Sequence, residues 1–426
     1  MKTWKRPRIA LYSHDTLGLG HIRRNILIAN ALSGSPLQPD ILLASGALEA
    51  TRFSLPKGTD RLVLPALCKH PDGQYGSRRF QMPLAEMINL RRYILRAALS
   101  AFNPDILIVD NVACGANMEL DATLAYLRAK GDCRIILGLR DIMDEPAAVA
   151  VEWAKSRRFE TIRSYFDEIW IYGDPSVYNP VEAYKVPPEN GAKVYFTGDV
   201  DQKKRLDSFM PEARENSAGH FKLPNHPFVF CTLGGGQDGT RLGEAFVSAL
   251  PSGTKGALLT GPHMDPKAQS RLFLRALNHA HLQVMDFLPE PAQWLEHADC
   301  VVAMGGYNSV SEILAFGKPA LIVPRVSPRK EQLIRAERLQ EMGLLDMIHP
   351  EDLNEVYLQR WITQHMGQPR RDLRNKIKLN GLDRIRNRFE EIVGPHHNSV
   401  SGHIVSVIFF QDTAKEIKKC PALPMS

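Results

Sequence analysis

The stretch Ser13–Asn25 (SHDTLGLGHIRRN) holds a histidine behind two glycines, directly after the apolar run Arg8–Tyr12. Gly20 and His21 are expected at the N-terminus of the following helix, where free backbone N–H groups favour anions. The helix dipole favours a neutral imidazole there by about 0.3–1 kcal/mol, and a general base must be neutral. The stretch therefore predicts either a general base or a histidine that merely begins a helix.

Asp110 is the expected partner of His21, because it ends the apolar strand Asp105–Asp110. The carboxyl ends of parallel strands meet at the sheet edge where the first loop also lies. A carboxylate there could fix the tautomer of His21 and stabilise the imidazolium that forms on proton transfer. Capping of the next turn is the alternative role. Arg140 and Asp141 also end a strand and could line the same cleft, although Arg–Asp pairs are common in structural roles.

Three strand-to-helix turns, the first loop included, have the composition of ligand-binding loops. The first loop begins like the dinucleotide fingerprint GxGxxG, but Arg23 occupies the third glycine position, which disfavours a dinucleotide site. In the second half, CTLGGGQDGTR (231–241) lies between a predicted strand and a predicted helix, which outlines a phosphate cradle. It is not a P-loop, because Thr240 stands where the lysine must be. Three adjacent glycines indicate a close approach between the backbone and another group.

The segment 298–325 contains a third strand-to-helix turn, with Gly305 and Gly306 before a helix that is expected to begin at Asn308 or Ser309. Ser309 and Glu312 have the spacing of a capping box, so Glu312 could bind the backbone N–H at the cap. Its carboxylate could instead accept hydrogen bonds from the two hydroxyls of a ribose. The spacing by itself favours the cap.

The alternation of short apolar strands with helical segments predicts an α/β protein with two doubly wound, parallel-sheet domains. We expect an N-terminal domain at 1–205, a polar linker at 206–227, a second domain at 228–393 and a tail at 394–426. Two such domains facing each other would form a cleft with binding loops from both sides. The strands are expected at 9–13, 40–44, 61–64, 105–110, 134–138, 168–172, 193–197, 228–232, 256–260, 282–286, 300–303 and 320–323.

Composition restricts the class of protein. The chain has 426 residues, 44% hydrophobic and 23% charged, with a net charge of +6, which describes a globular protein that weakly favours anionic partners. No basic tract is dense enough to predict nucleic-acid binding. Six scattered cysteines without a CxxC pair predict reduced thiols, no metal site and a cytoplasmic location. No apolar run approaches the roughly 18 residues of a membrane helix, so we expect a soluble or peripheral protein.

Residues Phe228 to about Met347 resemble the C-terminal, donor-binding domain of family 28 glycosyltransferases, the family of the MurG-type peptidoglycan N-acetylglucosaminyltransferase. The matching pieces, in the family's order and spacing, are LGGGQDG, MDFLPEPAQWLEHADCVVAMGGYNSVSEILAFGKPALIVP and SPRKEQLIRAERLQEMG. GLGHIRRN resembles the first loop of the same fold. The resemblance implies the GT-B architecture, two Rossmann-like domains facing across a cleft, and a bacterial branch of predicted glycosyltransferases.

The resemblance also implies a donor site built from several turns of the second domain. By position, it consists of Gly235, Gly236 and Gln237 at the donor phosphates, Phe287 and Leu288 at the base, Gly306, Asn308 and Ser309 at the diphosphate, Glu312 at the ribose, and Glu331 and Gln332 near the sugar. Glu331 and Gly236 depart from the glutamine and serine of the MurG type, and TGDVDQ lacks that type's arginine. These departures argue against peptidoglycan synthesis itself.

His21 and Asp110 are similar to the histidine–aspartate pair of plant and macrolide GT-B transferases, which deprotonates an acceptor hydroxyl. The resemblance implies a nucleoside-diphosphate sugar donor, UDP-linked, and a hydroxyl acceptor that could be lipid-linked. Gly20, Arg23, Arg140 and Asp141 are the acceptor-side candidates. We expect no metal or other cofactor, because the helix dipole and backbone N–H groups can take up the charge of the leaving diphosphate. Peripheral contact with an anionic membrane is a further expectation.

Two alternatives remain open at this point. GLGHIRR is also similar to the first loop of nucleotide-sugar hydrolases of the pseudaminic acid pathway, in which the histidine activates water; an epimerase belongs to the same alternative. The longer segment between Leu64 and Asp105 argues for an acceptor-binding surface, unless its arginines (Arg78, Arg79, Arg91, Arg92 and Arg96) only form the solvated face of a helix. A non-catalytic nucleotide-sugar binding protein would keep the donor site without needing the pair His21–Asp110.

Overall fold

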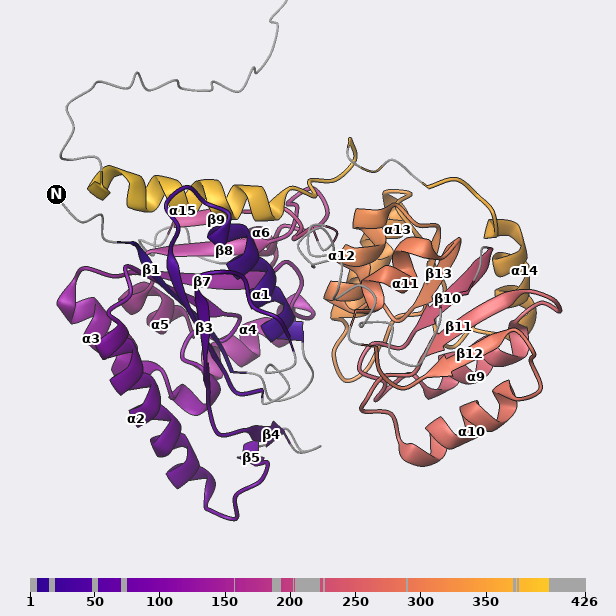
Figure 1. Cartoon of the computed structure of the whole chain (residues 1–426), viewed down its shortest axis with the longest axis horizontal. Coiled ribbons are helices and arrows are strands. Elements are labelled where there is room, and N and C mark those ends of the chain that lie inside the picture. The colour runs from indigo at the N-terminus through magenta and orange to yellow at the C-terminus, as the bar shows by residue number, and fades with distance from the viewer. Residues whose placement is uncertain are drawn as a thin grey trace, which may run out of the picture.

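A computed structural model describes residues 6–14, 20–47, 53–69, 75–156, 158–185, 193–201, 203, 223–224, 227–288, 290–370, 373 and 375–397, with side chains to 394. Within these ranges the chain forms two α/β domains that lie next to each other (Figure 1). The predicted linker lies almost entirely outside the described residues, and so does most of the tail. No described helix has the length and apolar character needed to cross a bilayer.

Uninterrupted apolar runs build the central strands of the first sheet, because helices cover both of its faces and bury these strands. Its strands are β1 (Arg8–Ser13), β2 (Asp40–Ser45), β3 (Thr59–Val63), β6 (Ile106–Asp110), β7 (Arg134–Arg140), β8 (Glu168–Tyr172) and β9 (Lys193–Phe196). In the described part of the chain they form a seven-stranded sheet in the order β3-β2-β1-β6-β7-β8-β9, with every pair parallel. Asp110 and Arg140 thus end neighbouring strands at one edge.

Helices cover both faces of this sheet and bury a hydrophobic cluster on each face. They are α1 (Gly20–Ser33), α2 (Leu84–Phe102), α3 (Asp121–Lys130), α4 (Pro146–Lys155), α5 (Arg158–Tyr165) and α6 (Pro180–Ala183), with the 3-10 turn η2 (Ala116–Met118). The helical pattern at 147–165, which would predict a single helix, corresponds to two helices in the structure, α4 and α5. A two-stranded antiparallel hairpin, β4 (Leu67–Lys69) and β5 (Tyr75–Ser77), precedes α2 and was not predicted.

The second domain repeats the same plan. Its strands are β10 (Phe228–Thr232), β11 (Lys255–Leu259), β12 (Leu282–Met285), β13 (Cys300–Ala303), β14 (Ala320–Ile322) and β15 (Asp346–Met347), and its helices are α9 (Thr240–Ala249), α10 (Pro266–Ala276), α11 (Pro291–His297), α12 (Tyr307–Phe316), α13 (Glu331–Glu341) and α14 (Glu355–His365). The sheet order, for the residues described, is β12-β11-β10-β13-β14-β15, again parallel. The predicted fold class, two doubly wound parallel-sheet domains, is confirmed.

The last of the described helices, α15 (Gly381–His397), returns to the first domain, as Figure 1 shows in yellow. Leu382, Ile385 and Phe389 join the cluster formed by α1 and β1, and Ser35 donates a hydrogen bond to Glu390 at 2.7 Å. The boundary 228–393 assigned this helix to the second domain. Its apolar face instead covers the first sheet, so the chain crosses between the domains twice.

The two crossings pack backbone against backbone. The Asp199 N–H donates to the Lys378 carbonyl at 2.9 Å, and the Gly381 N–H donates to the Asp199 carbonyl at 3.0 Å. A Cβ atom at Gly381 would lie 2.5 Å from that carbonyl oxygen, which leaves no room for any side chain. Residues 198–201 and 377–381 therefore form one joint between the domains.

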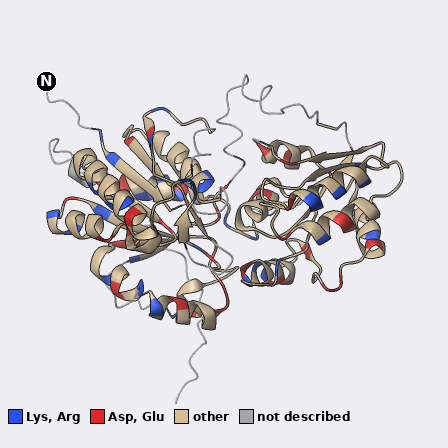
Figure 2. Ribbon diagram, turned by 90° about the horizontal axis from the view of Figure 1, so that it is seen from below, with Lys and Arg blue, Asp and Glu red and all other residues tan. Residues whose placement is uncertain are grey.

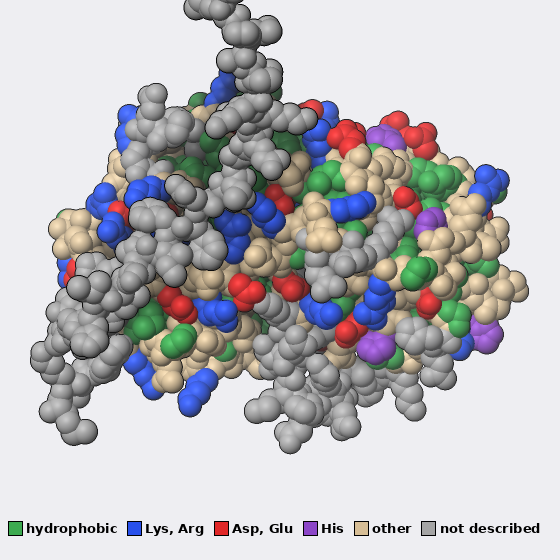
Figure 3. Space-filling view, turned by 90° about the horizontal axis from the view of Figure 1, so that it is seen from above, with side chains coloured by type: hydrophobic (Ala, Val, Ile, Leu, Met, Phe, Trp, Pro, Cys, Tyr) green, Lys and Arg blue, Asp and Glu red, His purple; other side chains and the backbone are tan. Residues whose placement is uncertain are grey.

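One arginine of α2 belongs to the interior of the protein. Arg91 is fully buried and pairs with Glu119, with 2.5 Å between Nε and Oε2, so it forms neither the basic acceptor surface nor the solvated face that were expected. Arg96 is half-buried, and its guanidinium lies 3.4 Å from the ring centre of Tyr126. Basic and acidic positions are interspersed along the ribbon in Figure 2, and side chains of both signs lie on the face in Figure 3.

Candidate active site

A cavity of about 330 Å³ lies between the two domains, at the carboxyl ends of the strands. Both domains contribute to its wall, as expected for a cleft between facing open sheets. The first domain contributes Gly20, His21, Arg23, Arg24 and Arg140; the second contributes Thr232, Gly234, Gly235, Leu259, Gly261, Pro262, His263, Asp286, Phe287, Leu288, Pro291, Gly306, Tyr307, Asn308, Ser309 and Glu312.

The structure brings His21 and Asp110 into direct contact. His21 is the second residue of α1, and its Nδ1 lies 2.5 Å from Oδ2 of Asp110 at the end of β6. The Asp110 side chain is fully buried, whereas the His21 side chain is 20% exposed and reaches the cavity. An ionised carboxylate can only accept a hydrogen bond, so Nδ1 carries a proton, and in the neutral imidazole Nε2 then keeps its lone pair. This tautomer is the one that a general base requires.

Arg24 completes this group, and the sequence prediction missed it. Arg24 is buried at 2% exposure, and its Nη2 lies 2.8 and 2.6 Å from the two oxygens of Asp110. Burial by itself raises the pKa of Asp110, but the charge of Arg24 and the interactions with His21 outweigh burial and hold the pKa of this carboxyl well below its usual range. Asp110 is therefore ionised at neutral pH. The signal for Arg24 was its spacing, since residues three apart share a helix face.

A chain of aromatic and ionic contacts links this group to the second domain. The Arg24 guanidinium lies 5.4 Å from the ring centre of Tyr172 and 5.5 Å from that of Tyr307, and the Tyr307 hydroxyl donates to the Tyr172 carbonyl at 3.1 Å. Arg335 of α13 lies 5.5 Å from the Tyr307 ring centre and pairs with Asp141, with 2.9 Å between Nη2 and Oδ1. Asp141 thus lies at the domain interface, outside the cavity wall.

In the glycine-rich turn after β10, only some of the residues predicted to bind the donor line the cavity. Gly234, with φ of +61°, and Gly235 line the cavity. Gly236 is buried, with φ of +94°, and a Cβ atom there would lie 2.4 Å from the Thr260 carbonyl. Gln237 is exposed and lies outside the cavity wall. Gly236 therefore packs against the turn after β11, and the placement of Gly236 and Gln237 at the donor phosphates stays a prediction.

Helix α12 directs its N-terminus at the cavity. Gly306 is the N-cap, and no side chain caps it, so Ser309 lies inside the first turn and cannot be the cap residue of a capping box. Glu312, at 6% exposure, lies one turn later in the cavity wall. The capping role of Glu312 is thereby excluded. Asn308 also lines the cavity and donates from Nδ2 to the Gly20 carbonyl at 3.3 Å, which joins α12 to α1.

Phe287 and Leu288, which follow β12, lie in the cavity wall as predicted for a base-binding turn. Leu288 is buried at 2% exposure, and the Phe287 N–H is already bound by Asp286 Oδ1 at 2.8 Å. His263, in the turn after β11, was missed by the sequence prediction. Its N–H donates to the Gly235 carbonyl at 2.9 Å, which ties the two turns together. The signal was its place after a predicted strand.

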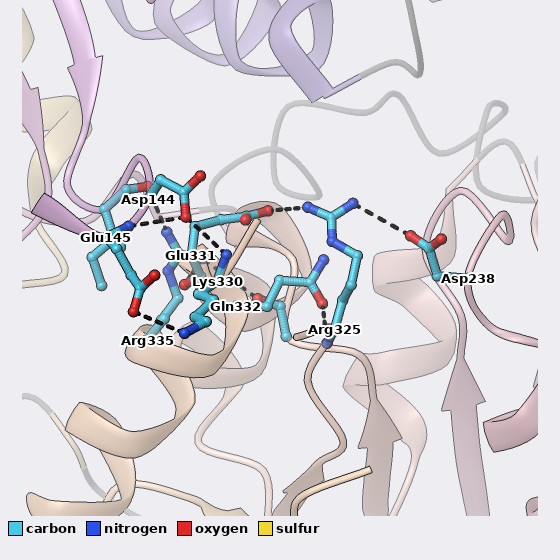
Figure 4. Close-up of polar contacts among 10 residues, drawn as sticks. Asp144, Glu145, Asp238, Arg325, Lys330, Glu331, Gln332 and Arg335 are labelled. Carbon is cyan, nitrogen blue, oxygen red and sulfur yellow. Dashed lines mark hydrogen bonds and ion pairs between the residues drawn. The ribbon is translucent and has the colours of Figure 1, made fainter. Parts of the chain in front are cut away.

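Glu331 and Gln332 do not line the cavity. Figure 4 shows that both hold Arg325: Glu331 Oε1 lies 2.5 Å from Nη2, and Gln332 Oε1 accepts from the Arg325 N–H at 3.0 Å. Next to them, Lys330 crosses to the first domain and pairs with Glu145, with 2.9 Å between Nζ and Oε1. Glu331 Oε1 and Gln332 Oε1 are thus engaged by Arg325, while Glu331 Oε2 is buried without a hydrogen bond among the described residues, and the placement of both residues near a donor sugar stays a prediction.

Comparison with known proteins finds a family model that matches part of the chain. Residues 230–389 match the glycosyltransferase family 28 C-terminal domain. Over 222 residues the chain is 25% identical to a UDP-N-acetylglucosamine--N-acetylmuramyl-(pentapeptide) pyrophosphoryl-undecaprenol N-acetylglucosamine transferase of Sulfurihydrogenibium, covering 49% of this chain and 60% of the relative. A protein of the same name from Alkaliphilus metalliredigens is 22% identical over 361 residues, covering 83% and 89%. The first alignment spans less than two thirds of that relative's length.

Solved structures share the two-domain fold. The kitacinnamycin glycotransferase superimposes with a TM-score of 0.59 at 17% identity, covering 91% of this chain and 99% of that structure. The UDP-GlcNAc 2-epimerase from Neisseria meningitidis, bound to UDP-GlcNAc, superimposes with a TM-score of 0.58 at 13% identity, covering 92% and 100%. At these identities the likeness shows the fold alone.

Proposed function

We propose that this chain, a GT-B protein whose second domain is a glycosyltransferase family 28 C-terminal domain, transfers a sugar from a nucleoside-diphosphate sugar to a hydroxyl group. The observation that carries the proposal is a single cavity to which the two domains contribute different functional groups. The wall from the first domain presents His21 backed by Asp110 and Arg24, and the wall from the second presents the N-terminus of α12 with Glu312. A base and an anion-binding helix therefore meet across one space.

The second-domain wall suits a nucleoside diphosphate. The uncapped N-terminus of α12 and the backbone of Gly234 and Gly235 can bind the two phosphates, since free N–H groups favour anions. Glu312 can accept hydrogen bonds from both ribose hydroxyls, and Phe287 offers a partly exposed ring to the base. The relatives' names specify UDP-N-acetylglucosamine, which makes a UDP-sugar the first donor to test.

The first-domain wall suits deprotonation of an acceptor. In the proposed step, Nε2 of His21 takes the proton from the acceptor hydroxyl as its oxygen bonds to the anomeric carbon. The bond from that carbon to the diphosphate oxygen breaks, and the electron pair leaves with the nucleoside diphosphate. Asp110 stabilises the imidazolium through Nδ1. The helix N-terminus stabilises the charge on the leaving phosphate without a metal ion.

A lipid-linked acceptor is the further part of the proposal. The relatives named above act on a pyrophosphoryl-undecaprenol substrate, according to their names. The segment leading into α2 and the helix itself expose Phe80 at 53% and Tyr93 at 73%, with Arg78 and Arg79 also exposed. Exposed aromatic and basic side chains together favour peripheral contact with an anionic bilayer.

The test is an assay of nucleotide sugars with and without a bacterial lipid extract. We expect sugar transfer only when the extract is present, and loss of turnover in His21→Ala with nucleotide binding nearly unchanged. His349→Ala, which removes a partly exposed histidine of the second domain, is the control. Wild-type turnover in His21→Ala would refute the base assignment. Release of free sugar without an acceptor would support a hydrolase instead, and interconversion of the nucleotide sugar would support an epimerase, whose fold this chain shares.

A further inference from the structure

We propose that Arg140 is an anion-binding residue of the cavity, which takes a phosphate group that lies next to His21. The phosphate belongs either to the leaving diphosphate of the donor or to a phosphorylated acceptor. The inference deepens the proposed function, because it assigns the first domain a phosphate contact of its own.

The position of Arg140 follows from the sheet. In the pairing of β6 with β7, Asp110 lies opposite Gly138, and Arg140 comes two residues later at the carboxyl end of β7. On the other side Arg140 pairs with Tyr172 of β8. These neighbours place its side chain beside the group formed by Asp110 and Arg24, and Arg140 forms part of the cavity wall together with His21.

Arg140 is partly buried and differs from the neighbouring arginines in forming no ion pair with a carboxylate among the described residues. Arg24 is paired with Asp110, Arg335 with Asp141, and Arg325 with Glu331. The Nε atom of Arg140 is buried and, within the described ranges, forms no hydrogen bond, as is also true of Nε in Arg325 and Arg335. A buried donor without a hydrogen bond costs free energy, so native structures rarely keep one without a reason.

Electrostatics around Arg140 favours an incoming anion. Burial, together with the neighbouring cations Arg24 and Arg335, lowers the pKa of Arg140 to about 10. The side chain is therefore still protonated at neutral pH, and the repulsion from Arg24 and Arg335 outweighs the attraction from Glu331 and Asp110. A phosphate bound here would relieve that repulsion, and the planar guanidinium can hold two phosphate oxygens at once.

A second feature faces the same space. The N-terminus of α12, whose cap residue Gly306 has no side-chain hydrogen bond, lies in the cavity wall across from Arg140. Helix α12 is ten residues long, and the positive end of its dipole, at this N-terminus, favours negative charge. An anion in this cavity is thus approached by a fixed cation from the first domain and by free backbone N–H groups from the second. This convergence fits a phosphate that lies between a donor and an acceptor.

The test measures ligand binding to the full-length protein by isothermal titration calorimetry. The variants are Arg140→Gln, Arg140→Lys and, as a matched control, Arg338→Gln, which removes an arginine that is 53% exposed on α13. The first probe is inorganic pyrophosphate alone. The second set is UDP, UMP and uridine. The third set compares farnesyl diphosphate with farnesol, each titrated into protein that is already saturated with UDP.

We expect Arg140→Gln to weaken pyrophosphate binding by roughly 10- to 100-fold, the usual range for a lost charge-assisted hydrogen bond, with a smaller loss in Arg140→Lys and none in the control. Weaker binding of UDP, with UMP and uridine unchanged, identifies the leaving diphosphate as the ligand. Weaker binding of farnesyl diphosphate, with UDP and farnesol unchanged, identifies the acceptor.

Unchanged affinity for every phosphate probe in Arg140→Gln would overturn the proposal. Failure of the wild type to bind UDP, with pyrophosphate binding that still depends on Arg140, would refute the proposed function and leave this inference standing. Thermal unfolding of Arg140→Met provides an independent readout. Removal of an unpaired cation is expected to raise the Tm of the ligand-free protein, and a lowered Tm would mean that Arg140 serves the fold.

Discussion

Replacement of Asp110 by asparagine separates the two roles that the structure assigns to this carboxylate. Asp110 accepts from His21 Nδ1 at 2.5 Å and from Arg24 at 2.6, 2.8 and 3.0 Å, all inside a fully buried pocket. Asparagine has almost the same shape but no charge. The Asp110→Asn protein therefore keeps the packing, leaves the buried Arg24 cation unpaired, and removes the anion that stabilises an imidazolium.

The expected loss of stability follows from the burial of both partners. Breaking a buried ion pair by removing one partner costs about 3–5 kcal/mol, because the remaining charge is uncompensated. At about 2–4 °C per kcal/mol for a domain of this size, the Tm of the first domain should fall by roughly 6–20 °C. The rate of transfer should fall on the order of 10³- to 10⁴-fold, because the amide can hold the wrong tautomer of His21 and carries no counter-charge.

A double-mutant cycle makes the test specific. Arg24→Met combined with Asp110→Asn removes both charges, so the double variant should regain most of the lost stability but none of the activity. Asp132→Asn, which changes an aspartate whose side chain is 54% exposed, is the control and should behave like the wild type. Differential scanning calorimetry and a sugar-transfer assay provide the two readouts.

The pH dependence of stability has a definite sign. The pKa of Asp110 is lowered in the folded state, so its contribution is present above the unfolded pKa of about 3.9 and is lost as the pH falls through the folded pKa. The difference in Tm between wild type and Asp110→Asn should persist from pH 7 to about pH 4 and narrow only below. An Asp110→Asn protein with unchanged Tm and near-normal turnover at pH 7 would refute the reasoning.

Three further predictions follow from other buried carboxylates and their partners. Glu312→Ala should weaken UDP binding about tenfold, measured by calorimetry, with little change in Tm; unchanged affinity would remove Glu312 from the donor site. Arg335→Met should cost about 3–5 kcal/mol, seen as a lower Tm, because Asp141 is left unpaired at the domain interface; a Tm equal to that of wild type would contradict this. Burial, together with Asp141, raises the pKa of Asp199, so its favourable contribution is present below about pH 3.9 and lost as the pH rises through the folded pKa. Asp199→Asn should therefore raise the Tm at pH 7, and this gain should shrink towards pH 4; a lower Tm at pH 7 would contradict it.

Local patterns determined the strands, the fold class and the main site pair. Each strand of an open parallel sheet must be apolar along its length, and its carboxyl end must face the ligand, so Asp110 and His21 could be placed together before any coordinates were known. The resemblance to the family 28 domain, and not the sheet pattern, implied a donor site with Gly235, Phe287, Asn308 and Glu312, and these four residues line one cavity. Only the prediction of the pair His21–Asp110 depends solely on the period of the sequence and the topology of the sheet.

The tertiary structure decided which partner each polar group has. Arg24 sits next to Arg23 in the sequence, and only the packing of α1 on β6 shows that Arg24 is the one that binds Asp110. The family resemblance implies that Glu331 lies near the sugar. In the structure, the loop before α13 brings Arg325 into contact with the Glu331 carboxylate. Helix α15 has an ordinary amphipathic pattern that does not say which sheet it covers. Hydrophobic periodicity is a local property of the chain, whereas charge pairing and domain contact depend on distances between segments far apart in sequence.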